Sequence, residues 1–258
     1  EKNQSFAIVE GSRGCTYSCR YCSQWKFWRQ CRRRKSVHRL ASEIATIHQD
    51  YGSSFFWLTD DNLGFDQMEA FCEALLTYNL SGVTWFLQAR SDDILQYQHV
   101  LPKMQQAGNI WMLIGIDTPN PQALATFHRQ GIDPLQAKEA IDLLRDHDIF
   151  SQGTFIIGHR SDSHESIAQL RAYADYLNPD IATFMALTPF PGTDIYSEAR
   201  RQKRIEITDW AQYDMVHAIM PTQYLTREEV QRELVNCYRG YFGSWGRRYR
   251  GLFAANPI

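Results

Sequence analysis

Six short apolar runs, separated by longer helical stretches, constrain the fold of this 258-residue chain more than any other feature. Each run is rich in β-branched and aromatic residues and is apolar on both faces, which is typical of strands buried in a parallel sheet. The predicted strands are residues 6–9, 54–59, 84–88, 110–116, 154–158 and 181–187.

Amphipathic helices are expected between these strands. One apolar stripe at helical spacing covers residues 37–47, and another covers residues 137–144. Asp162 and Thr226 each precede a glutamate by three residues, a pattern that marks the start of a helix with a capping acid.

Strand–helix units in series imply right-handed crossovers and parallel strands. The sequence therefore predicts an α/β fold in which six units form a partial (βα)6 TIM-like barrel, open on one side. A doubly wound flat sheet is the alternative. We expect residues 1–204 to form the barrel and residues 205–258 to form a C-terminal helical extension.

Polar residues and glycines collect where the predicted strands end. The segments that follow the strands are, in order, "EGSRGC", "TDDN", "QARSDD", "GIDTP", "GHRSD" and "LTPFPGT". In parallel βα folds the active site lies at the carboxyl ends of the strands, so these segments predict where chemistry takes place.

Three cysteines form the only close cysteine constellation in the sequence. Cys15, Cys19 and Cys22 are spaced C-x3-C-x2-C directly after the first strand, and thiolates select zinc, copper(I) or iron–sulfur clusters. Structural zinc normally takes four protein ligands, for which Cys31 or His38 would have to supply the fourth. An iron–sulfur cluster held by three cysteines instead leaves one iron open for chemistry.

The remaining composition excludes several other classes. The number of cysteines is even, but a chain of this length is not a small disulfide-stapled domain, and Cys72 and Cys237 fit the apolar sides of helices. A net charge of −2 gives no global nucleic-acid signature. The sequence shows no apolar run of membrane-spanning length and no signal peptide, so a cytoplasmic protein is expected.

The cysteine spacing after a first strand resembles the radical S-adenosylmethionine (SAM) superfamily. "LIGIDT", "TFIIG" and "TPFPGTDIY" resemble strand-end motifs of the same superfamily, so the similarity runs from about Phe6 to Tyr196. The resemblance implies a 4Fe–4S cluster on Cys15, Cys19 and Cys22, whose open iron binds SAM. Reductive cleavage of SAM then yields a 5′-deoxyadenosyl radical.

The resemblance also implies SAM-binding residues in the first two strand-end segments. Tyr21, which precedes the third cysteine, is expected near the adenine. Asp60, Asp61 and Asn62 stand where many members carry a glycine-rich segment ending in glutamate, and one of the three is expected to reach the SAM ammonium.

Later strand ends supply the other expected contacts. Arg90 is the natural partner of the SAM carboxylate, and Asp117 with Thr118 would contact the ribose or the methionine part. Asp117 replaces the more usual glutamate. His159, which follows the fifth strand, is a further candidate in the pocket.

The stretch "SRGCTYSCRYCSQWKFWR" is more specific and resembles the cobalamin-linked branch of the superfamily. That branch includes the anaerobic magnesium-protoporphyrin IX monomethyl ester oxidative cyclase and related methyltransferases. The resemblance implies an amphipathic, tetrapyrrole-like substrate, a flavodoxin or ferredoxin as electron donor, and cobalamin bound mainly by a domain upstream of Glu1. The chain itself has no D-x-H-x-x-G cobalamin motif.

A basic and aromatic run follows the cysteines, from Lys26 to Lys35. Trp25 and Trp28 are predicted to form part of the wall of the substrate site, with neighbouring arginines facing an anionic substrate. A solvated helix surface and an RNA-binding surface are the alternatives. For the whole protein, the competing functions are a radical SAM enzyme that modifies RNA and a non-catalytic iron–sulfur electron carrier.

Overall fold

The computed structural model describes residues 5–243 and 245–248, and in these residues the predicted parallel sheet is present. All six long strands pair in parallel in the order β1-β4-β5-β6-β7-β8, with each strand next to its neighbour in the sequence. The strands are β1 Ser5–Val9, β4 Ser53–Leu58, β5 Thr84–Ala89, β6 Asn109–Asp117, β7 Phe150–Ile157 and β8 Ile181–Ala186.

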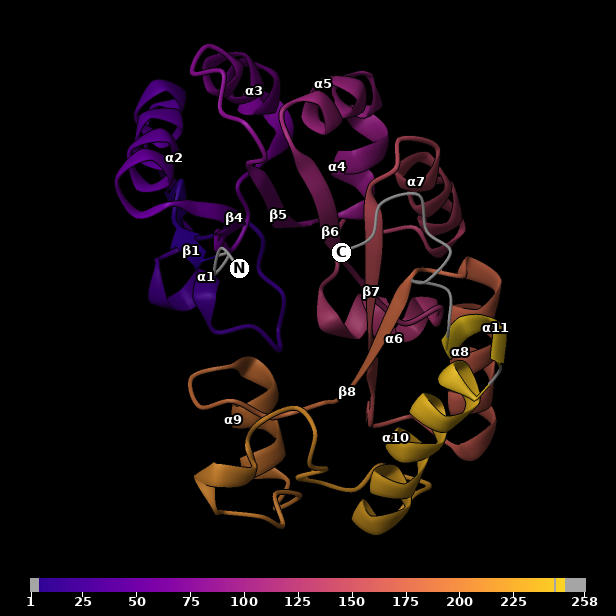
Figure 1. Cartoon of the computed structure of the whole chain (residues 1–258). Coiled ribbons are helices and arrows are strands. Elements are labelled where there is room, and N and C mark those ends of the chain that lie inside the picture. Colours follow the sequence, from indigo (N-terminus) through magenta and orange to yellow (C-terminus); the bar gives the residue numbers. More distant parts are fainter. Residues whose placement is uncertain (1–4, 244, 249–258) are drawn as a thin grey trace.

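The sheet curls into a partial barrel with helices on its outer side (Figure 1). β1 and β8 are the two edges and do not pair, so the barrel is open between them. This confirms the α/β partial-barrel prediction and excludes the flat doubly wound sheet. The helices are α1 Gln24–Phe27, α2 Val37–Tyr51, α3 Met68–Leu76, α4 Ser91–Gln96, α5 Leu101–Gln106, α6 Pro121–Phe127, α7 Pro134–Asp146, α8 His164–Leu177, α9 Asp194–Arg201, α10 Arg227–Phe242 and α11 Trp245–Arg248.

The two faces of the sheet differ in burial, which the sequence did not indicate. Phe56, Leu58 and Trp85 lie under the helices and are completely buried, whereas the residues between them on the same strands are only half-buried. Since helices cover only the outer face, the apolar residues of the inner face line the open interior of the barrel. The prediction of strands buried on both faces was therefore wrong for the inner face of β4 and β5, whereas the second half of β7 is buried on both faces.

Strand β7 begins four residues before its predicted start. The polar residues Ser151 and Gln152 interrupt the apolar run from which the strand was predicted. In the structure Ser151 is buried and bonded to Asp180. Glycine at position 153 leaves room for the Ile116 side chain, whose terminal Cδ1 would lie 2.8 Å from a Cβ atom there.

The predicted helix starts are correct at one position and shifted at the other. Thr226 caps α10 in a reciprocal capping box with Glu229. The cap of α8 is Ser163 rather than Asp162. The Asp162 carboxylate instead accepts the backbone N–H groups of Gly158 and His159 at the end of β7.

The C-terminal part of the described chain packs against the barrel. α10 lies on β8 and α8, and the hydroxyl of Tyr238 bonds both backbone groups of Phe184 in β8. Residues 249–258 of the predicted extension lie outside the described residues.

Candidate active site

The three cysteines lie in the segment that connects β1 to α2, which we call the excursion. Two short strands, β2 Ser12–Arg13 and β3 Arg33–Arg34, pair antiparallel and so join the two ends of this excursion. We call residues 14–22 the cysteine loop. Its geometry requires Gly14, which has φ +90°, because a Cβ atom would lie 2.2 Å from the Cys31 carbonyl oxygen.

The thiols of the cysteine loop are close enough to influence one another. Cys19 is buried, and Cys15 and Cys22 are half-buried. Burial raises the pKa of Cys22 to about 11, with the backbone of Gln24 acting against it and Cys19 and Cys15 adding to it. Burial also raises the pKa of Cys15. Thiolates at these positions therefore need a bound cation.

Three thiols in one short loop are the donor set that a 4Fe–4S cluster with one open iron takes. Across residues 5–243 and 245–248, no three cysteine, histidine or acidic side chains surround one common metal position. A 4Fe–4S cluster binds each thiolate to a different iron and so needs them further apart than one zinc ion does. Cys31 and His38, the alternative zinc ligands, are both exposed.

Arg90 lies beside the cysteine loop at the end of β5. It is buried, and one nitrogen of its guanidinium has no hydrogen-bond partner in the described structure. Its guanidinium carbon is 3.7 Å from the centre of the Tyr17 ring, and two of its nitrogens bond Asp92 at 2.9 and 2.7 Å. The remaining nitrogen, Nη1, is buried and has no hydrogen-bond partner within the described structure. An unpaired buried guanidinium nitrogen is suited to a ligand carboxylate.

The three polar residues after β4 have different surroundings. Asp60 is buried, and its Oδ2 accepts the Gly11 N–H at 3.1 Å, which fixes the start of the excursion. Asn62 accepts from Arg32 through both its backbone and side-chain oxygens. Asp61 is half-buried, and burial raises its pKa. Its charge acts on both Cys15 and Cys22, so it lies near two of the three thiols.

A buried polar network lies at the end of β6. Asp117 accepts a 2.8 Å hydrogen bond from the Tyr21 hydroxyl and pairs with Arg129 at 2.6 Å. It adopts φ +65° where the register between β6 and β7 shifts, so the bulge aims its carboxylate at the cysteine loop. Burial, followed by the Asp117 charge, raises the pKa of Tyr21 well above its usual value. Thr118 is buried beside Asp117, and its hydroxyl accepts the Asn120 N–H at 3.2 Å.

Sequence reasoning missed Arg129 and Tyr17. Arg129 reaches the cysteine loop from a position 110 residues along the chain and contacts Cys19. No local pattern marks it, because it follows the short helix α6 and belongs to no strand end. Tyr17 lies inside the cysteine motif, and the aromatic ring between the first two cysteines was the available signal.

The predicted substrate-wall residues support the cysteine loop. The Trp25 indole N–H donates to the Cys19 carbonyl at 2.9 Å. Trp28 packs on Gly14, where a Cβ atom would lie 2.8 Å from the Trp28 Cβ. Both contacts would also be present if Trp25 and Trp28 only packed against the cysteine loop.

The cations of the basic run mostly have acidic partners. Arg34 makes two hydrogen bonds to Asp66, at 2.6 and 2.8 Å, and Arg32 lies 3.7 Å from the same carboxylate. Lys26 pairs with Asp194. These pairs leave less positive charge for phosphates than the sequence suggests.

His159 is buried after the end of β7. Its ring packs edge-on against Phe127, and its Nδ1 lies 2.8 Å from the Ser161 hydroxyl. Burial, followed by Arg204, lowers its pKa.

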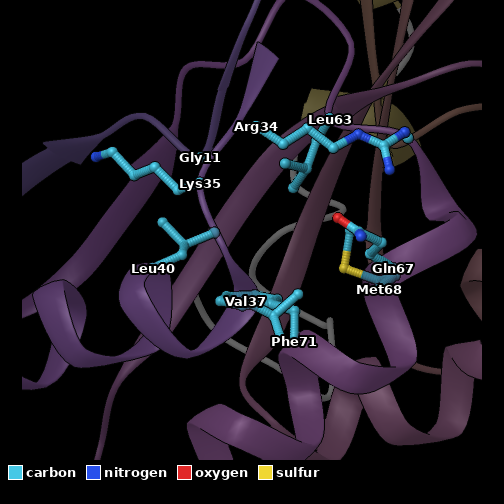
Figure 2. A pocket seen from close by; sticks show the side chains of 10 residues that line it. Gly11, Arg34, Lys35, Val37, Leu40, Leu63, Gln67, Met68 and Phe71 are labelled. Carbon is cyan, nitrogen blue, oxygen red and sulfur yellow. The ribbon is translucent and has the colours of Figure 1, made fainter. Parts of the chain in front are cut away.

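A cavity with apolar and basic lining residues lies between α2 and α3 (Figure 2). Leu40, Leu63, Met68 and Phe71 supply its apolar lining, and Gly11 lies at its edge. None of the three cysteines lines it, so this cavity is separate from the thiol site.

Known proteins resemble this chain in sequence and in fold. The model of the radical SAM superfamily matches residues 9–174. The anaerobic magnesium-protoporphyrin IX monomethyl ester cyclase of Cereibacter sphaeroides is 31% identical over 92% of this chain and 38% of its own length. The corresponding cyclase of Rubrivivax gelatinosus is 31% identical over 93% of this chain and 43% of its own length. The chain thus spans about two fifths of these relatives.

Solved structures share the fold. The cobalamin-dependent SAM radical enzyme OxsB, with aqua-cobalamin and SAM bound, aligns with a TM-score of 0.67 at 15% identity, covering 95% of this chain and 41% of OxsB. Coproporphyrinogen III oxidase from Escherichia coli aligns with a TM-score of 0.60 at 15% identity, covering 92% of this chain and 51% of the oxidase. In the described part of the chain, no helix is long and apolar enough to span a membrane.

Proposed function

The chain belongs to the radical SAM superfamily, and from this premise we propose that Cys15, Cys19 and Cys22 hold a 4Fe–4S cluster whose open iron binds SAM. When reduced, such a cluster supplies the electron that cleaves SAM to methionine and a 5′-deoxyadenosyl radical. The observation that carries the proposal is the placement of three mutually interacting thiols beside the unpaired nitrogen of Arg90.

Residues around the thiols supply complementary charges for the amino acid part of SAM. Arg90 would hold the carboxylate through Nη1 while Asp92 and Tyr17 fix its orientation. Asp61 would face the ammonium, and Asp60 and Asn62 support the segments on either side of it. Tyr21, Asp117 and Thr118 would contact the adenosine part, and the Tyr21–Asp117 bond keeps the first two in place.

We further propose oxidative cyclisation or methylation of an amphipathic, tetrapyrrole-like substrate. Relatives with these two activities match the chain, among them the cyclases and a bacteriochlorophyllide d methyltransferase of Chlorobaculum tepidum that is 27% identical over 93% of this chain. Trp25 and Trp28 would form part of the substrate wall. A flavodoxin or ferredoxin would donate the electron, and cobalamin would be bound mainly by a part of the protein outside residues 1–258.

Two further proposals concern the division of the chain and the cellular location of the protein. Residues 1–204 would form the catalytic barrel, and residues 205–258 an extension that packs on β8 and α8 through α10. A cytoplasmic location would suit an oxygen-sensitive cluster.

The acidic partners of the basic run count against an enzyme that acts on RNA. Salt-dependent phosphate binding requires free cations, whereas Arg34 and Lys26 are paired. A plain electron carrier would have no use for the buried, unpaired nitrogen of Arg90.

Anaerobic reconstitution with iron and sulfide tests the proposal. We expect about four irons per chain, as a three-cysteine 4Fe–4S site requires, and formation of 5′-deoxyadenosine from SAM once dithionite is added. S-adenosylhomocysteine would form in addition if the protein is a methyltransferase. A protein that binds one zinc ion tightly and takes up no iron would refute the proposal.

A further inference from the structure

The guanidinium of Arg129 contacts three groups at once and is almost completely buried. Its Nε lies 2.6 Å from the Asp117 carboxylate, its Nη2 donates to the Gly115 carbonyl at 2.7 Å, and its Nη1 lies 3.8 Å from the Cys19 sulfur. Only 8% of the Arg129 side chain is exposed. The third contact is within the range of an N–H···S hydrogen bond, and it comes from a charged donor.

The backbone around Arg129 is fixed to the cysteine loop. His128 ends α6 in a left-handed conformation with φ +60°, which turns the chain back towards the loop. The Arg20 N–H donates to the Phe127 carbonyl at 3.0 Å, and the Ser18 hydroxyl lies 3.1 Å from the His128 ring. These bonds on both sides hold Arg129 against Cys19.

The positive charge of Arg129 is directed at the sulfur. The Asp117 carboxylate lies against Nε, a different nitrogen of the guanidinium from the Nη1 that contacts Cys19, and it also accepts the Tyr21 hydroxyl. An arginine side chain is always protonated in proteins, so Arg129 is a permanent cation beside the most buried of the three cysteines.

We propose that Arg129 is a positioning residue that raises the reduction potential of the cluster through Cys19. This inference rests on the proposed function, because it requires a cluster on the cysteine loop. Reduction adds a negative charge to the cluster, and a nearby cation that hydrogen-bonds a ligand sulfur stabilises the reduced state more than the oxidised state. In a buried site, water screens this effect only weakly.

The test is the midpoint potential of the reconstituted cluster, measured without SAM by redox titration with electron paramagnetic resonance detection. We expect Arg129→Gln to shift the potential to lower values and Arg129→Lys to give a smaller shift in the same direction. Asp117→Asn should shift it to higher values, because it removes the anion and leaves the cation. The potential of the double variant, Arg129→Gln with Asp117→Asn, should be lower than that of Asp117→Asn alone. This comparison isolates the effect of Arg129 from that of an unpaired Asp117.

Arg145→Gln is the matched control, since it removes an arginine of α7 whose guanidinium pairs with Asp142. Its potential should match that of the unmodified protein. Equal potentials for all variants with full iron content would overturn the inference, whereas failure of the unmodified protein to take up iron would refute the proposed function instead. If Arg129→Gln loses its cluster, Arg129→Lys and Asp117→Asn decide, and shifts absent or opposite to those stated overturn the inference.

Discussion

The guanidinium of Arg90 stacks on the ring of Tyr17, with 3.7 Å between the guanidinium carbon and the ring centre. This contact joins the end of β5 to the cysteine loop. The charge of Arg90 also acts on Cys15, whose pKa it lowers against the stronger effect of burial.

Loss of Arg90 should weaken SAM binding. Arg90→Ala is expected to cost roughly 1.5–3 kcal/mol, the usual range for hydrogen bonds to charged groups. Arg90→Lys should lose most of this as well, because a lysine cannot bond Asp92 with two nitrogens and also reach a carboxylate. Equilibrium binding of SAM to the reconstituted protein measures the effect, and unchanged affinity in Arg90→Ala would show that Arg90 only supports the loop.

Single cysteine substitutions should separate the cluster ligands from the core thiols. Replacing Cys15, Cys19 or Cys22 with alanine is expected to abolish stable iron binding. Cys72→Ala is the matched control, because Cys72 is completely buried away from the loop and burial raises its pKa to about 12. That control should keep its iron and lose about 1 kcal/mol of stability. Iron and sulfide analysis after reconstitution gives the answer.

A side chain at position 14 should destabilise the cysteine loop by more than the strain of its left-handed backbone conformation alone. Gly14→Ala would place a Cβ atom 2.2 Å from a backbone oxygen, whereas Gly52→Ala, at φ +70°, meets no atom within 4 Å. We expect Gly52→Ala to cost about 1–2 kcal/mol from left-handed strain alone. Gly14→Ala should cost more and also lose iron. Equal losses of stability in urea unfolding would contradict the predicted clash.

The buried carboxylate of Asp162 should make stability depend on pH. Burial raises its pKa to about 6, although the N–H groups of His159 and Gly158 act against this. The folded state then binds the proton more tightly than the unfolded state, so this contribution is complete below about pH 4 and is lost as the pH rises through 6. In Asp162→Asn, the fall of the unfolding free energy between pH 4 and 6 should be smaller. Urea titrations at several pH values test this, and an unchanged slope would assign the effect to other groups.

Trp28→Leu distinguishes a substrate wall from loop packing. Leucine keeps apolar bulk against Gly14 but removes the flat ring. If Trp28 contacts substrate, turnover on the physiological substrate should fall while SAM cleavage without substrate persists. A variant that melts at a lower temperature yet keeps full coupled turnover would mean that Trp28 only packs.

The tertiary structure revealed residues around the thiols that the sequence did not indicate. Arg129 lies 110 residues from Cys19, and no pattern of spacing connects them. Their contact depends on the bulge at Asp117 and on the left-handed end of α6 at His128, both of which are set by packing. The partners of the basic run were equally hidden, because Asp66 comes from the segment after β4.

By itself, the sequence determined the parallel strands and the cysteine loop, whereas the structure decided between a partial barrel and a doubly wound sheet. Strand periodicity is local, and in a series of βα units all strands run parallel, so segments far apart along the chain reach one edge of the sheet by topology alone. Cys15, Cys19 and Cys22 are close together because eight residues contain them. Only the tertiary structure decided which polar groups surround these thiols and which face of each strand is open, because charge pairing and burial depend on side chains that meet only after the sheet has curled.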